Sequence, residues 1–62
     1  MEGEGVNMFE KVIVSEVIHG KATVNTYRNI TKIYTEDEYI HISNGLYTWG
    51  FKIDNIVSIV II

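Results

Sequence analysis

Apolar and polar side chains alternate over residues 39–53, and the alternation is interrupted once, by Asn44-Gly45. Asn-Gly is the favoured pair for a two-residue type I′ turn, because both residues tolerate a positive φ. The pattern therefore predicts a β-hairpin with its turn at Asn44-Gly45. Ile42 is then expected to face Tyr47 across the two strands.

The hydrophobic pattern and the turn chemistry agree on a single register for this hairpin. Its expected core face is apolar and holds Ile40, Ile42, Tyr47, Trp49 and Phe51. Its opposite face is more polar and holds Tyr39, His41, Thr48, Gly50 and Lys52. The aromatic rings of the first face are expected to form a minimal core, so binding residues are sought on the second face.

Two further strands are predicted before the hairpin. Residues 9–18 (FEKVIVSEVI) can be arranged as a helix with its apolar residues on one side, but their branched side chains favour a strand. Residues 22–34 form a longer strand whose two faces exchange near Ile30, as they do at a bulge or a sharp bend. Such a bend is how a small barrel passes from one sheet to the next.

Short polar segments separate the predicted strands. Gly20 gives residues 19–21 a permissive backbone for a turn, and the polar residues 35–38 form another. Asp54 and Asn55 can bond to their own backbone, which favours one tight turn or a single 3₁₀ turn. Residues 57–62 (VSIVII) follow as an almost uniformly apolar last strand.

The composition supports one all-β domain. The apolar residues are mainly Ile, Val, Tyr, Phe and Trp, whose side chains fit a pleated sheet and crowd a helix. We expect residues 9–62 to form this domain. Residues 1–8, which contain two glycines and two glutamates, are expected to be a disordered tail.

The sequence predicts five strands joined by short turns, with a bend in the second strand and a tight turn before the last. This arrangement resembles an SH3-like or Sm-like small β-barrel. The resemblance covers residues 9–62 and lies in strand count, turn placement and the final ten residues. It implies a strongly bent, five-stranded antiparallel barrel. Sm-like proteins bind RNA as rings, but this chain has no recognisable version of their RNA-binding loops, so no functional residue is transferred to it.

Charge and cysteine content narrow the range of partners. Eight acidic residues against five basic ones give a net charge of −3, and a nucleic-acid binder needs a basic face. No apolar run is long enough to span a membrane, and the N-terminus lacks the features of a signal peptide. Because there is no cysteine, disulfides and thiolate-bound zinc are excluded. We therefore expect a cytoplasmic protein whose partner is neither nucleic acid nor membrane.

The chain offers little for catalysis or metal binding. His19 and His41 fall in different elements, and the acids at 36–38 match no metal-binding loop. The serines lack the sequence context of a nucleophile, and no pair of carboxylates suggests acid–base chemistry. We therefore expect no enzyme activity, no metal and no cofactor.

Two groups of residues are candidates for protein contacts. The last strand is apolar on both faces and carries no charge that would guard an edge, so Val60 and Ile62 are expected to take part in self-association. An exposed aromatic residue beside a cation can anchor an interface, so Tyr39, His41 and Lys52 are expected to meet a protein partner. Tyr39 has an alternative role, which is to cover Gly50 on the neighbouring strand.

The leading hypothesis is a small non-enzymatic interaction module that acts through protein–protein contacts as a homo-oligomer. Short regulators and inhibitors of this kind are encoded by cellular genomes, phages and mobile elements. The alternative is an Sm-like or SH3-like nucleic-acid-binding barrel. Its expected contact residues are Tyr27, Arg28, Lys32 and Tyr39, with both tyrosines pointing outward.

Overall fold

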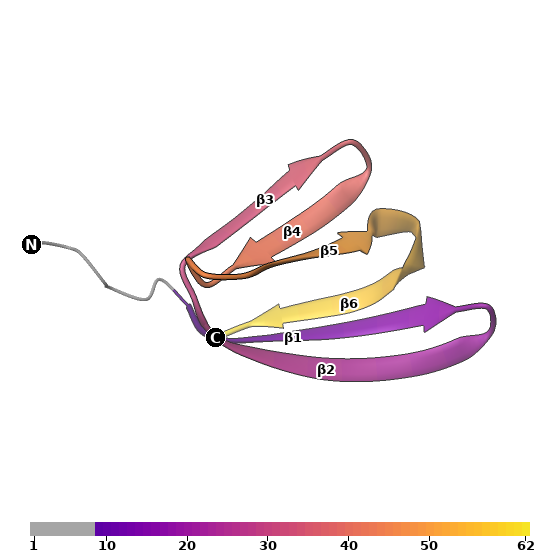
Figure 1. The fold of residues 1–62 in the computed structure, drawn as a ribbon. Helices are drawn as coiled ribbons and strands as arrows, with labels where there is room; N and C mark the ends of the chain where they lie inside the picture. Colours follow the sequence, from indigo (N-terminus) through magenta and orange to yellow (C-terminus); the bar gives the residue numbers. More distant parts are fainter. Residues whose placement is uncertain (1–8) are drawn as a thin grey trace, which may run out of the picture.

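The computed structural model describes residues 9–62, and the expected disordered tail at residues 1–8 lies outside the described residues. Residues 9–62 form six strands in two antiparallel sheets (Figure 1). The elements are β1 (Phe9–Ile18), β2 (Lys21–Ile30), β3 (Lys32–Glu36), β4 (Tyr39–Ser43), β5 (Thr48–Lys52), the 3₁₀ turn η1 (Ile53–Asn55) and β6 (Ile56–Ile61). This part of the chain contains no helix with the length and apolar character needed to cross a membrane.

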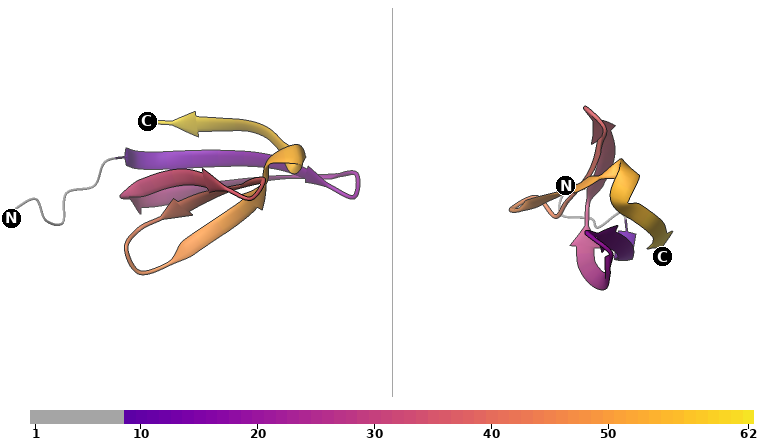
Figure 2. Two further views of the ribbon diagram at one scale, coloured as in Figure 1. Left: turned by 90° about the horizontal axis from the view of Figure 1, so that it is seen from above. Right: turned by 90° about the vertical axis from the view of Figure 1, so that its right-hand side faces the viewer.

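Each sheet has three strands. The first sheet has the order β2-β1-β6 and the second the order β3-β4-β5. Figure 2 shows β6 at the margin of the first sheet, where η1 has carried the chain over from β5. The all-β prediction is confirmed, with six strands instead of the expected five. Over residues 9–62 no strand pairing joins the two sheets, so the expected closed barrel is not seen.

The extra strand arises at the predicted bend. Thr31 alone separates β2 from β3, and Asn29, two residues earlier, has a left-handed backbone with φ of 60°. This backbone turns the chain from the first sheet into the second, and Ile30 is buried at the corner. The exchange of faces near Ile30 is therefore confirmed, although it divides the long strand into two.

Two of the other predicted turns lie where they were expected. His19 and Gly20 connect β1 to β2, and both have a positive φ, as a type I′ turn requires. Asp54 lies in the single 3₁₀ turn before the last strand.

The turn between β4 and β5 differs from the prediction. Ile42 pairs with Trp49 rather than with Tyr47, and the amide of Asn44 donates to the carbonyl of Tyr47 over 3.1 Å. The central residues are therefore Gly45, with φ of 96°, and Leu46. The Asn44 side chain decides this, because its Oδ1 accepts the amides of both Leu46 and Tyr47 at 2.8 Å. The register moves by two residues, so each strand keeps its predicted faces.

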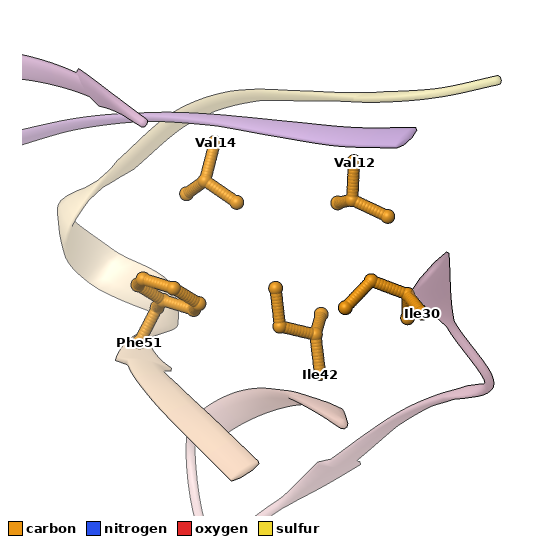
Figure 3. Packing of buried hydrophobic residues seen from close by; sticks show 5 residues of the cluster. All are labelled: Val12, Val14, Ile30, Ile42 and Phe51. Carbon is orange, nitrogen blue, oxygen red and sulfur yellow. The ribbon is translucent and has the colours of Figure 1, made fainter. Parts of the chain in front are cut away.

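The core lies between the two sheets. Val12 and Val14 of β1 point toward Ile42 and Phe51 of the second sheet, and Ile30 closes one end (Figure 3). Partly buried side chains surround these five: Phe9, Tyr27, Ile33, Ile40, Trp49, Ile56 and Ile59. Tyr47 was expected in the core, but it lies beside the turn and is 65% exposed.

Candidate interaction surfaces

The outer face of the second sheet gathers aromatic and basic side chains. Ile42 is buried, and side chains alternate between the two faces of a strand. The odd-numbered residues Tyr39 and His41 of β4 therefore point away from the core. The antiparallel register sets Tyr34 of β3 opposite His41, and Lys52 of β5 opposite Tyr39. We call this surface the aromatic–basic face. Its side chains include Lys32, Tyr34, Tyr39, His41 and Lys52, and the acidic Glu36 lies on the same face opposite Tyr39.

The rings at the centre of the aromatic–basic face contact one another. Tyr34 and His41 are stacked, with centroids 4.9 Å apart and planes at 18°. The Lys32 ammonium lies 5.1 Å from the centroid of Tyr34, which places a cation against this ring. Contacts within the protein therefore already occupy much of the stacking surface that a nucleobase would need.

Tyr39 is the most accessible aromatic residue of the aromatic–basic face, with a relative exposure of 43%. Its centroid lies 6.3 Å from that of His41, and Lys52 is its direct neighbour on β5. The structure thus brings together the three residues that the sequence assigned to a protein partner. Tyr34 belongs to the same group and was missed, because the bend at Ile30 hid the register of β3.

Gly50 is covered by His41 rather than by Tyr39. A Cβ built on Gly50 would lie 3.3 Å from Nδ1 of His41 and 3.9 Å from Cδ2 of Tyr39. His41 stands directly opposite Gly50 in the ladder, which explains the closer contact. Covering Gly50, which was the alternative role considered for Tyr39, is therefore mainly the role of His41.

The outer face of the first sheet carries several exposed apolar side chains. Val60 of β6 pairs with Ile13 of β1, and these side chains point away from the core because Val12 and Val14 point into it. The same face carries Val24 on β2, which is 65% exposed. We call this surface the apolar outer face. Its apolar side chains are Ile13, Val17, Val24, Val60 and Ile62, and Lys11, Ser15, Thr26, Arg28 and Ser58 lie on the same side of the sheet.

Strand β6 is an edge strand that is apolar on both sides. Val60 and Ile62 are 47% and 61% exposed on the outer face, and Ile61, which pairs with Val12 on the core side, is 48% exposed. Its six residues (IVSIVI) include no charged side chain. The other strands that end a sheet, β2, β3 and β5, each carry at least one lysine. Charged side chains on an edge strand guard against edge-to-edge pairing. Among the edge strands of residues 9–62, only β6 has no charged side chain.

The residues of the nucleic-acid alternative do not share one surface. Tyr27 was expected to point outward, but it packs against Trp49 and Phe51 with ring centroids 5.0 Å and 5.6 Å away. It pairs with Val12 and so faces the core, whereas Arg28 faces the opposite side of the same strand. Lys32 and Tyr39 lie on the second sheet.

Glu16 is a buried carboxylate that sequence reasoning missed. It continues the inward alternation of Val12 and Val14 and is 9% exposed. It lies where the pairing of β1 with β6 shifts register. Burial raises the pKa of Tyr27 above its ordinary value, and the negative charge of Glu16 raises this pKa further. The alternation was the signal that could have placed Glu16 inside.

In the part of the chain that the structure describes, the residues considered for metal binding or catalysis do not lie together. His19 lies in the turn between β1 and β2, and His41 lies on the second sheet. No three potential metal ligands come together among residues 9–62, and these residues enclose no pocket. The features available for recognition are thus the aromatic–basic face, the apolar outer face and the edge of β6.

Comparison with known protein families, with curated proteins and with solved structures finds no match to this chain.

Proposed function

We propose that this chain is a small non-enzymatic interaction module that assembles with copies of itself and regulates or inhibits a protein partner. Its fold is proposed to be an open variant of the SH3-like small barrel. Two features support this proposal: the bent β2–β3 segment that feeds both sheets, and the 3₁₀ turn before a last strand that returns to β1.

The exposed apolar surface of β6 carries the proposal of self-association. Val60 and Ile62 are accessible on a face that also holds the exposed Val24. A chain of 62 residues has little core of its own, so burial of this surface against a second copy adds stability that the monomer lacks. Exposed apolar side chains gathered on one face are typical of an interface.

The aromatic–basic face is the proposed site for the partner protein. Tyr39 supplies an accessible ring, and aromatic residues are frequent anchors of protein interfaces. Lys52 lies beside Tyr39 at the start of β4, whereas Lys32 lies opposite Ser43 at its end. Glu36 lies opposite Tyr39 on its other side, so the face presents two cations and one carboxylate, which favours a partner surface of mixed charge with an excess of carboxylates.

Light scattering tests the self-association. The intact chain is expected to have at least twice the mass of the monomer, which is 7.1 kDa. Val60→Lys and Ile62→Lys are expected to restore the monomeric mass, because each would bury a charge without a partner. A monomeric mass for the intact chain at all concentrations would overturn this part of the proposal.

A further inference from the structure

We infer that the second copy binds by strand pairing, β6 against β6 in antiparallel orientation, with Val60 of one copy facing Val60 of the other. This inference rests on the proposed self-association and specifies its geometry. It would join two three-stranded sheets into one continuous six-stranded sheet, with the twofold axis at Val60.

The backbone of β6 has hydrogen-bonding groups that point away from β1. The amide of Ile62 donates to the carbonyl of Lys11 over 2.9 Å, and the carbonyl of Ile62 accepts the amide of Glu10 over 3.0 Å. In an antiparallel strand, alternate residues bond to the same neighbour. Val60 therefore bonds toward β1, and the amides and carbonyls of Ile59 and Ile61 face the open edge.

The β1–β2 turn leads to the same assignment independently. The two-residue turn at His19 and Gly20 closes on the pair Ile18 and Lys21, which is a hydrogen-bonded pair in such hairpins. From Val12 onward, even-numbered residues of β1 therefore bond to β2, and odd-numbered residues bond to β6; before this stretch, the amide of Glu10 bonds to Ile62 instead. Ile13 is thus bonded to Val60, which leaves Ile59 and Ile61 free to pair with another chain.

The register follows from the regular part of β6. The pairing with β1 shifts between Ser15 and Glu16, opposite the start of β6, and is regular from Ser58 onward. Val60 lies midway between Ile59 and Ile61, the two residues of this regular part whose amides and carbonyls face the open edge. A twofold axis there pairs Ile59 with Ile61 of the partner in both directions and gives two hydrogen-bonded pairs.

The exposure of β6 on both faces favours this edge pairing over stacking of the two apolar outer faces. Stacking would cover Val60 and Ile62, but it would leave Ile61 exposed on the core side. In edge pairing, the apolar β6 of the second copy lies alongside this strand, so it covers side chains on both faces of β6. Edge pairing also brings no two charges together, because β6 has none.

Cysteine cross-linking tests the register, since the natural chain contains no cysteine. Val60→Cys is expected to form a disulfide-linked dimer under mild oxidation, because facing residues of a non-hydrogen-bonded pair have closely spaced Cβ atoms. Val24→Cys is the matched control, since it is on the same face and is 65% exposed, and it is expected to stay monomeric in a denaturing gel. Equal cross-linking of both variants would indicate stacked faces and would overturn the strand pairing.

Two proline variants and amide exchange separate the geometry from the self-association itself. Ile61→Pro removes an amide that faces the open edge, so the fold is expected to persist while the mass halves. Val60→Pro removes an amide bonded to β1 and is expected to unfold the chain. In the intact protein, the amides of Ile59 and Ile61 are expected to be protected from exchange. A dimer without this protection refutes the strand pairing alone, whereas a monomeric intact chain refutes the proposed function as well.

Discussion

The imidazole of His41 lies directly against the backbone of Gly50, with Nδ1 3.3 Å from the point where a Cβ would be. The ring cannot retreat, because Tyr34 is stacked on it at 4.9 Å between centroids. A glycine in the middle of a strand normally weakens it, but here its missing side chain makes room for the ring.

Gly50→Val is therefore expected to lower the free energy of unfolding by about 1–2 kcal/mol, because the added side chain overpacks the site. In a His41→Ala background, Gly50→Val is instead expected to raise the free energy of unfolding, since valine then gains strand propensity with no ring to displace. Urea unfolding of the two single variants and the double variant gives both values. Destabilisation of the same size in the His41→Ala background would show that the contact with His41 is not the cause.

The turn between β3 and β4 is a second site where one substitution has a definite sign. Asp37 and Glu38 have φ of 53° and 67°, and Glu36 pairs with Tyr39 on either side of them. This is the backbone of a type I′ turn, but it contains neither glycine nor asparagine. Glu38→Gly is expected to raise the free energy of unfolding by about 1 kcal/mol, because glycine adopts a positive φ without steric cost.

Gly20→Ala is the matched control for this turn. Gly20 has φ of 78° and open space around it, so alanine there meets only the backbone strain and no clash. It is expected to lower the free energy of unfolding by about 1 kcal/mol, the reverse of the effect at Glu38. Thermal unfolding measures both variants, and a change in the same direction for the two would contradict the assignment of the turns.

The sequence predicted most of the β structure, because its alternation and turn residues act locally. The bend at Ile30, the 3₁₀ turn before β6 and the faces of β4 and β5 all follow from neighbouring residues. The hairpin register was wrong by two residues, because the Asn44 side chain accepts two amides and moves the turn forward. Nothing in the local pattern distinguishes this arrangement from a type I′ turn at Asn44-Gly45.

The candidate surfaces were only partly predictable, because they depend on contacts between sheets. Tyr39, His41 and Lys52 lie on one hairpin, so alternation alone grouped them. Tyr27 was misplaced because its contacts with Trp49 and Phe51 come from the opposite sheet. Such contacts depend on how the bend at residues 29–31 positions the two layers, which a pattern of apolar and polar residues does not specify.

The contacts of Tyr27 predict a dependence of stability on alkaline pH. Burial first, and the charge of Glu16 second, raise the pKa of Tyr27 above its ordinary value of 10.0. Below this value the phenol is protonated in both the folded and the unfolded chain, so it adds no pH dependence. Above it the unfolded chain loses the proton first, so the folded state loses stability as pH rises toward the folded pKa.

Tyr27→Phe removes this titration and largely preserves the ring contacts. The free energy of unfolding of the intact chain, relative to that of Tyr27→Phe, is expected to fall between about pH 9 and pH 11. Urea unfolding across this range measures the difference, and the other tyrosines and the lysines cancel because both chains share them. A difference that stays constant with pH would show that Tyr27 has the same pKa in both states.

Glu16 gives the last prediction, because a carboxylate at 9% exposure lies on the core side of β1. Residues 9–62 show no hydrogen bond or ion pair to its side chain; its one described electrostatic contact is the unfavourable one with Tyr27. Burying a charge in these surroundings costs free energy, and a neutral side chain of the same size costs less. Glu16→Gln is therefore expected to raise the free energy of unfolding at neutral pH by about 1 kcal/mol.

Glu10→Gln is the matched control, because it removes the same charge from an exposed position on the same strand. Its effect is expected to stay within about 0.5 kcal/mol. Absorbance titration of Tyr27 gives a second measurement in the Glu16→Gln chain, where its pKa is expected to fall only part of the way, since burial is the larger cause. Destabilisation by Glu16→Gln would mean that the carboxylate makes a favourable interaction in the folded protein, and that the buried charge supports the junction of β1 and β6 instead of weakening it.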